Sequence, residues 1–68
     1  MINVFKDAPD WVRYRTFDFD GNEWWFENRP VAVDITKSWL TDYGEWKFTG
    51  RTLNGKKWRQ SLRIRNCR

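Results

Sequence analysis

Histidine is absent from the sequence, and cysteine occurs once among the 68 residues, as Cys67. These shortages exclude an intramolecular disulfide and the usual zinc sites, whose ligands are cysteine and histidine. Long apolar runs are also lacking: the longest spans residues 24–26, whereas a membrane-spanning helix needs roughly 20 apolar residues. We therefore expect no membrane segment and no signal peptide, and the lone thiol fits a reducing cytoplasm.

Aromatic residues are abundant, with six tryptophans, five phenylalanines and two tyrosines. A chain this short is expected to form one domain, over residues 1–68, whose core supplies only roughly 3–5 kcal/mol net. Each aromatic side chain can bury about 150–250 Å², so a few rings are enough to build that core. The same abundance argues against disorder.

Charge is segregated along the chain. Residues 1–46 carry five basic and nine acidic side chains, a net of −4, whereas residues 47–68 carry eight basic and none acidic, a net of +8; the two sum to the overall +4. This asymmetry predicts a molecule with an acidic and a basic part.

Alternating β-branched and aromatic residues predict a hairpin between Val12 and Asn28, with its turn on Asp20-Gly21-Asn22. Since successive strand residues point to opposite faces, a two-residue loop at either position within this turn brings four rings to one face. That face is the predicted core side, with Phe17, Phe19, Trp24 and Phe26. The other face would be mostly polar, and would hold Trp25 with Tyr14 beside or diagonal to it.

The rest of the chain is predicted to form further strands and the turns between them. Residues 31–35 and 45–49 alternate, residues 36–44 fit a helical turn or a loop, and Asn54-Gly55 is a strong turn dipeptide that would join a second hairpin. Residues 57–65 fit a strand or a short helix. We predict a mainly β fold: a single-layer or partly closed antiparallel sheet of four or five strands made of two hairpins, with room for one short helix. The predicted core comprises Phe17, Phe19, Trp24, Phe26, Val31, Val33, Trp46, Phe48, Leu53, Trp58 and Leu62.

Two segments carry a resemblance to a known class of proteins. Residues 8–30 read APDWVRYRTFDFDGNEWWFENRP, and residues 58–62 read WRQSL. Together they resemble small tryptophan-rich proteins of tailed bacteriophages and prophages, which open with Ala-Pro-acidic-Trp and close with Trp-x-x-Ser-Leu. The match covers under half of the chain, and the tail is more basic here, with Arg65-Asn66 where a proline often follows. The resemblance implies a phage accessory protein acting inside an infected bacterium and transfers no catalytic residue.

The acidic motifs predict no chemistry. The segment DFDGNE, from Asp18 to Glu23, places its glycine and glutamate too early for an EF-hand loop, so a solvated turn is preferred to a weak divalent-metal site. Paired carboxylates act as acid and base when one of them lies in a dry pocket, and none is expected near Asp18, Glu23 or Glu27. With no histidine and no Gly-rich phosphate loop, we predict that the chain is not an enzyme and uses no cofactor or metal.

The basic half supplies the first candidate binding surface. Arginines and lysines interleaved with aromatic rings are typical of sites that contact phosphates and stack on bases. The candidates are Lys56, Lys57, Trp58, Arg59, Arg63 and Arg65. The alternative is a solvated face whose charge offsets the acidic half.

Trp25 and Tyr14 form the second candidate, because Trp, Tyr and Arg are enriched at interface hot spots. The alternative for Trp25 is a small second cluster, covered by the tail or by the loop around Trp39 and Tyr43. Burial of Trp25 against another copy, in a homodimer, would also relieve a marginal core.

These features lead to one functional hypothesis and one alternative. The preferred hypothesis is a non-enzymatic phage protein that binds and inhibits a host bacterial protein, a defence or housekeeping factor, in the host cytoplasm. The alternative is a nucleotide or nucleic-acid binder, including a sponge for a defence signalling nucleotide, that uses the basic half and exposed rings.

Overall fold

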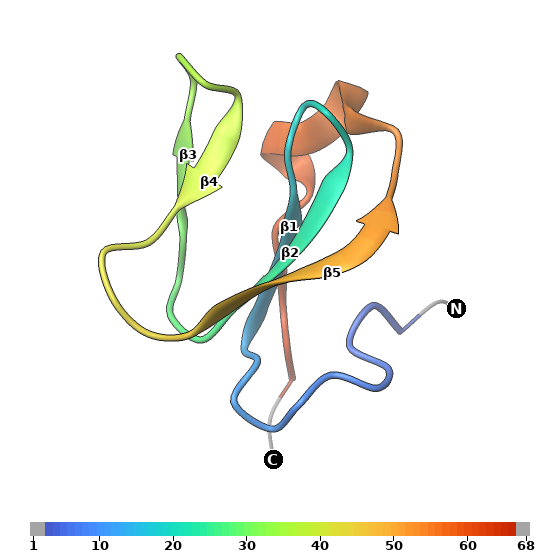
Figure 1. Cartoon of the computed structure of the whole chain (residues 1–68), viewed down its shortest axis with the longest axis vertical. Coiled ribbons are helices and arrows are strands. Elements are labelled where there is room, and N and C mark those ends of the chain that lie inside the picture. Colours follow the sequence, from blue (N-terminus) through green and yellow to red (C-terminus); the bar gives the residue numbers. More distant parts are fainter. Residues whose placement is uncertain (1–2, 67–68) are drawn as a thin grey trace.

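The computed structural model describes residues 3–66, so Cys67 lies outside the described residues. Two antiparallel sheets stand beside each other, and a short 3₁₀ helix lies at one end of the larger sheet (Figure 1). The larger sheet has the strand order β5-β2-β1-β6, and the smaller pairs β3 with β4. The elements are β1 (Tyr14–Phe17), β2 (Asn22–Phe26), β3 (Val31–Val33), β4 (Ser38–Leu40), β5 (Trp46–Thr52), η1 (Gly55–Gln60) and β6 (Arg63–Ile64).

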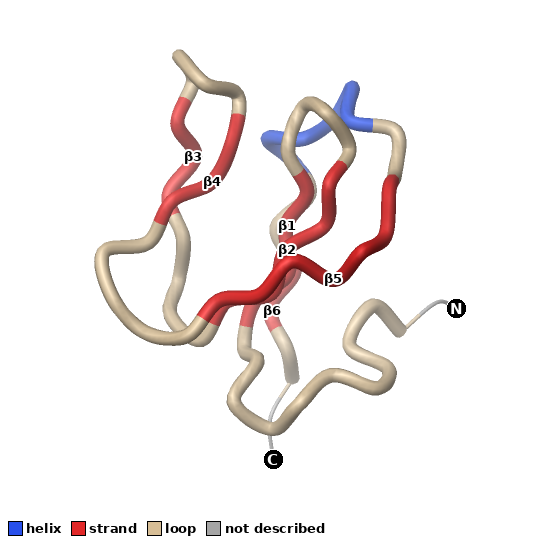
Figure 2. The backbone as a smooth tube through the Cα atoms, viewed as in Figure 1, coloured by secondary structure: helices blue, strands red, loops and turns tan. Residues whose placement is uncertain are grey.

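The prediction of a mainly β, antiparallel fold is confirmed, and the described strands form no closed barrel. The second predicted hairpin is wrong. β5 and β6 lie at opposite edges of the larger sheet, each paired with a strand of the first hairpin (Figure 2). The Asn54-Gly55 pair begins the helix η1 instead of a hairpin turn, because the Asn54 side chain accepts a hydrogen bond from the backbone N–H of Lys56. The tail therefore contains both predicted alternatives, first helix and then strand.

The β1–β2 hairpin forms as predicted, but its register differs by one residue from that of a loop on Asp20-Gly21 and by three from that of a loop on Gly21-Asn22. Its loop comprises the three residues 19–21, closed by a backbone hydrogen bond from Asp18 N to Asn22 O at 3.1 Å. Gly21, with φ of 88°, takes the left-handed position that ends a three-residue hairpin loop. The Asp18 carboxylate accepts a second bond from Asn22 N at 3.0 Å, which favours this loop over a two-residue turn.

A one-residue change of register moves side chains between the faces of a sheet. Thr16 now lies opposite Trp24 and Phe17 opposite Glu23. We call one side the aromatic face; it comprises Tyr14, Thr16, Trp24 and Phe26, with Trp46 and Phe48 of β5. We call the other side the charged face; it comprises Arg15, Phe17, Glu23 and Trp25, with Lys47 and Arg63. The prediction that Phe17 shares a face with Trp24, and Tyr14 with Trp25, is wrong.

The buried apolar side chains are few: Val12, Trp25, Phe26 and Trp58. Phe26 and Trp58 confirm the predicted core, while Phe17, Trp24, Val33 and Leu62 are half-buried. The core assignment is wrong for five residues that are exposed, namely Phe19, Val31, Trp46, Phe48 and Leu53. Part of the aromatic face therefore remains in contact with solvent, because the second sheet that residues 3–66 form, the β3–β4 hairpin, is two short strands wide.

Candidate functional site

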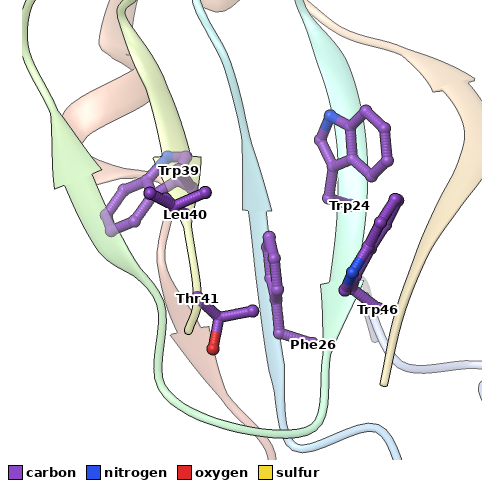
Figure 3. A pocket seen from close by; sticks show the side chains of 6 residues that line it. All are labelled: Trp24, Phe26, Trp39, Leu40, Thr41 and Trp46. Atoms are coloured by element: carbon purple, nitrogen blue, oxygen red, sulfur yellow. The ribbon is translucent and has the colours of Figure 1, made fainter. Parts of the chain in front are cut away.

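An aromatic cleft opens between the larger sheet and the β3–β4 hairpin. Its volume is about 210 Å³, and Figure 3 shows its lining side chains, contributed by β2 and β5 on one side and by β4 with the residue after it on the other. They are Trp24, Phe26, Trp39, Leu40, Thr41 and Trp46. Three indoles around one space form a concave and mostly apolar site, which is the usual character of a binding pocket.

On the sheet side of the cleft, Trp24 and Trp46 pack together, and Phe48 packs against Trp24 beside the cleft. Trp24 packs against Trp46 with ring centroids 5.7 Å apart, and against Phe48 at 5.2 Å, both in tilted geometry. Aromatic pairs at these distances attract each other beyond their burial. The Trp24 indole also donates a hydrogen bond from Nε1 to Asp18 Oδ2 at 3.3 Å, so its ring orientation is held from the hairpin loop.

The hairpin side of the cleft is anchored by Trp39. Its indole Nε1 donates to the backbone oxygen of Phe17 at 3.1 Å. Its ring meets Trp58 edge-on, with centroids 6.1 Å apart. Because both walls are fixed by hydrogen bonds and ring contacts, the cleft is formed before any ligand arrives, which lowers the entropy cost of binding.

Trp25, the first predicted contact residue, does not line this cleft. Its side chain is 6% exposed on the charged face, so the prediction that it stands free is wrong. The guanidinium of Arg51 covers its ring, 5.6 Å from the centroid. The alternative interpretation is confirmed in that Trp25 is buried, but the recorded cover is Arg51 of β5 and not the tail or the loop around Trp39 and Tyr43. Tyr14, its predicted companion, is half-buried on the opposite face of the sheet.

The charged face is closed by a buried network around Glu23. The Glu23 carboxylate accepts a hydrogen bond from Thr49 Oγ1 at 2.8 Å, and it forms ion pairs with Arg51 Nε at 2.8 Å and with Arg15 Nε at 3.5 Å. Burial lowers the pKa of the Arg15 guanidinium, and the charge of Glu23 opposes that shift. Arg15 also donates from Nη1 to the Ser61 carbonyl at 3.0 Å. A buried cation with these partners has a structural role.

The basic candidates on η1 are dispersed. Trp58 is buried, as its place in the predicted core requires, so its ring is not open to a ligand as its place among the binding candidates would require. Arg59 is exposed and pairs with Asp34 at 3.2 Å. Lys56 and Lys57 are exposed on the helix, and a 3₁₀ helix does not align them with the later arginines as a strand would.

The two arginines of the last strand region bind the backbone of the protein itself. Arg63 Nη1 donates to two carbonyl oxygens in the turn before it, both at 3.0 Å. Arg65 Nη1 donates to the carbonyl oxygens of Pro9 and Val12, at 2.8 and 3.1 Å. These contacts tie the carboxy-terminal segment to the sheet and to the amino-terminal segment, so the predicted basic stripe is largely engaged within the molecule.

A second, shallower groove lies between β3, Trp39 and the helix η1. It is about 660 Å³ in volume and lined in part by Arg29, Trp39, Arg59 and Gln60. Of the predicted basic candidates, only Arg59 borders it, and Arg29 was not predicted. Guanidinium groups near an indole are suited to anions that carry a flat ring.

No helix among residues 3–66 is long and apolar enough to cross a membrane. Nor do three or more His, Cys, Asp or Glu side chains in this range gather as metal ligands would.

Sequence reasoning missed the cleft because it assigned Trp24, Phe26 and Trp46 to the core. The number of aromatic residues was the available signal, because thirteen are more than a 68-residue domain can bury. That surplus predicts exposed rings but not their positions, which depend on the register and on how the β3–β4 hairpin docks.

Comparison with family models, with curated proteins and with solved structures found no match.

Proposed function

We propose that this chain is a non-enzymatic binding protein that holds an apolar segment of a partner protein in the aromatic cleft. The observation that carries the proposal is the cleft itself, a preformed space of about 210 Å³ lined by three tryptophans. Tryptophan in a central, well-packed pocket is the residue most often found at the energetic centre of protein interfaces.

The exposure of the aromatic face supports a protein partner over a small molecule. Trp46 and Phe48 are 59% and 44% exposed beside the cleft, and Leu40 is 61% exposed at its other wall. An apolar surface that continues beyond a pocket is typical of protein–protein contact sites. The cleft would take one or two apolar side chains, while the surrounding rings contact the rest of the segment.

The resemblance to phage accessory proteins supplies the proposed setting. The partner would be a protein of the infected bacterium, met in the host cytoplasm, and binding would block its action. Because the cleft carries no charged lining residue, we expect the affinity for that partner to depend only weakly on salt.

The proposal is tested by capturing the partner from phage-infected bacteria, purifying it, and measuring its dissociation constant for matched variants. Leu40→Glu places a charge in the wall of the cleft, and we expect it to weaken binding at least about tenfold, since an unpaired charge is costly in a desolvated interface. Ile35→Glu is the control: Ile35 lies on the same hairpin, is 96% exposed and does not line the cleft.

Ile35→Glu should bind within about twofold of the unmodified chain. A partner that binds the Leu40 and Ile35 variants with the same affinity would show that the cleft is not the contact site. Circular dichroism of both variants establishes that each is folded.

The groove beside η1 favours one second candidate, an anion-binding function directed at a nucleotide or nucleic acid. Arg29 and Arg59 flank the groove next to the Trp39 ring. Small molecules released from the captured protein, together with titration of a short single-stranded oligonucleotide, test it. Binding should fall steeply with salt because counterions are released, and Arg29→Glu with Arg59→Glu should abolish it. Binding that survives both charge reversals would eliminate this candidate.

A further inference from the structure

β5 forms one edge of the larger sheet, and within residues 3–66 no strand pairs with its outer side. Its residues are exposed except for Thr49. An unpaired edge presents backbone donors and acceptors to any extended chain that approaches it. What this edge can bind depends on the direction in which each of its backbone groups points.

The pairing of β5 with β2 identifies the outward groups. Glu27 N donates to Glu45 O at 2.9 Å, and in the same register Trp25 pairs with Lys47. Hydrogen-bonded and non-hydrogen-bonded pairs alternate along antiparallel strands. The N–H and C=O groups of the intervening residues, Trp46 and Phe48, therefore point away from β2. A partner strand must form its bonds with these two residues.

The part of the β5 edge that can pair with an added strand is short. Between the pairs formed by Asn22 and Trp24, β5 leaves the regular register, with Gly50 at φ of 87°. Such a bulge interrupts pairing and prevents open-ended addition of strands. Pairing is thus restricted to residues 44–49, a length that a single added strand can satisfy.

Charge alternates along this short edge on the charged face. Glu45 and Lys47 lie on that face, two residues apart, while Trp46 and Phe48 lie on the aromatic face. A sequence with Glu and Lys on either side of a central Trp is complementary to itself when it runs antiparallel, because each carboxylate then faces the ammonium of the other copy. This self-complementarity points to a second copy of the chain as the occupant.

The possible registers can be compared directly, since outward residues must pair with outward residues. Centring the pair on Trp46 places Glu45 opposite Lys47 twice. A shift by one step in either direction places Glu45 opposite Glu45, or Lys47 opposite Lys47, and like charges directly opposite are unfavourable. A further step, centred on Phe48, would require pairing through the bulge at Gly50.

We propose that two copies of this chain associate through antiparallel pairing of their β5 strands, centred on Trp46, with Glu45 of each copy opposite Lys47 of the other. The arrangement is twofold symmetric and closed. It joins the two four-stranded sheets into one of eight strands and places the two Trp46 rings opposite each other on a continuous aromatic face. Trp46, 59% exposed in the single chain, becomes the central contact.

Charge reversal tests the register. Sedimentation velocity should give the mass of a dimer for the unmodified chain, and of a monomer for Glu45→Lys and for Lys47→Glu, since each single change brings like charges together. An equimolar mixture of the two single variants should form a mixed dimer, because every cross-strand pair is then Lys opposite Glu. The double variant, with both changes in one chain, should recover the homodimer.

A disulfide test uses the Cys67→Ser background, so that one thiol remains. Trp46→Cys should cross-link two copies under mild oxidation, because directly hydrogen-bonded residues have Cα atoms about 5.5 Å apart, within the range of a disulfide. Phe48→Cys is the matched control. In the proposed register it lies four residues from its own copy, about 14 Å away, and should not cross-link.

Three results would each overturn the proposal: a monomeric unmodified chain, a dimer that tolerates both single charge reversals, or single variants that do not combine on mixing. Faster cross-linking through Phe48→Cys than through Trp46→Cys would overturn the register. Leu40→Glu, the cleft variant, should remain dimeric, so the failure of the partner proposal leaves this one standing, and the reverse holds as well.

Discussion

The two faces of the larger sheet carry side chains of opposite chemistry, and their exposure differs most between the pair Arg15 and Glu23 on the charged face and the pair Trp46 and Phe48 on the aromatic face. On the charged face, Glu23 and Arg15 are 3% and 7% exposed. On the aromatic face, Trp46 and Phe48 keep about half of their surface in water. Charged groups are buried at low cost only when they are paired and hydrogen-bonded, and the Glu23 network meets that condition with Arg15, Arg51 and Thr49. Aromatic rings need only be shielded from water by other residues, and a chain this short has too few residues to shield all of its rings.

The comparison teaches that hydrophobicity alone does not identify the core side of a small sheet. Pairing of charges allows Glu23 and Arg15 to be buried on the charged face, while Phe26 and Thr16 are buried on the aromatic face. The exposed part of the aromatic face, at Trp46 and Phe48, then carries the apolar surface that is available for contact with other molecules. Substitutions on each face, and in the turn between β1 and β2, test this contrast.

Replacing a tryptophan with alanine should lower the free energy of unfolding by very different amounts on the two faces, and this is the largest expected difference. Trp25→Ala empties a buried site and is expected to lower the free energy of unfolding by about 3–5 kcal/mol, enough to unfold a domain of this size. Trp46→Ala removes an exposed ring and its contact with Trp24, and should cost about 1 kcal/mol. Urea unfolding in dilute protein, where association does not contribute, measures both. Equal losses would contradict the assignment of the faces.

Removal of the central carboxylate charge should have the next largest effect. Glu23→Gln leaves the Arg15 cation buried without a counter-charge, and breaking a buried pair in this way costs about 3 kcal/mol. Asp42→Asn, a change at an exposed carboxylate, should stay within about 0.5 kcal/mol. Thermal unfolding followed by circular dichroism compares the two. A Glu23→Gln variant as stable as the Asp42→Asn variant would show that the network does not hold the charged face together.

The third experiment tests the turn that sets the register. Gly21→Ala places a Cβ 1.8 Å from the Leu53 carbonyl oxygen and in a left-handed conformation, so the loop must change or the chain must move. We expect it to cost about 2–3 kcal/mol. Gly50→Ala has nearly the same φ but no atom within 4 Å of the added Cβ, and should cost only about 1–2 kcal/mol. Similar losses for both would mean that the close approach of Leu53 does not constrain the loop.

Several elements were predictable from sequence patterns. The β1–β2 hairpin, the strands near residues 31–33 and 46–49, and the mainly β class follow from alternation and from turn residues, which act over a few neighbours. The helix η1 and β6 were predicted only as alternatives, since Trp58 and Leu62 fit either period. Exposed rings were expected from the sequence, but the candidate contact residues were Trp25, Tyr14 and the basic half of the chain, and not the side chains that line the cleft.

The amino-acid sequence by itself determined the local elements of this protein, its excess of aromatic residues and its uneven charge, because these depend on residue type and near neighbours. The assembled fold alone determined which side chains of each face are buried. A three-residue loop at residues 19–21 sets the pairing of β1 with β2, and the Glu23 carboxylate gains Arg51 and Thr49 from a strand more than twenty residues away. The register determines which side chains share a face, and the assembled charge network stabilises the burial of Arg15 and Glu23 on the charged face.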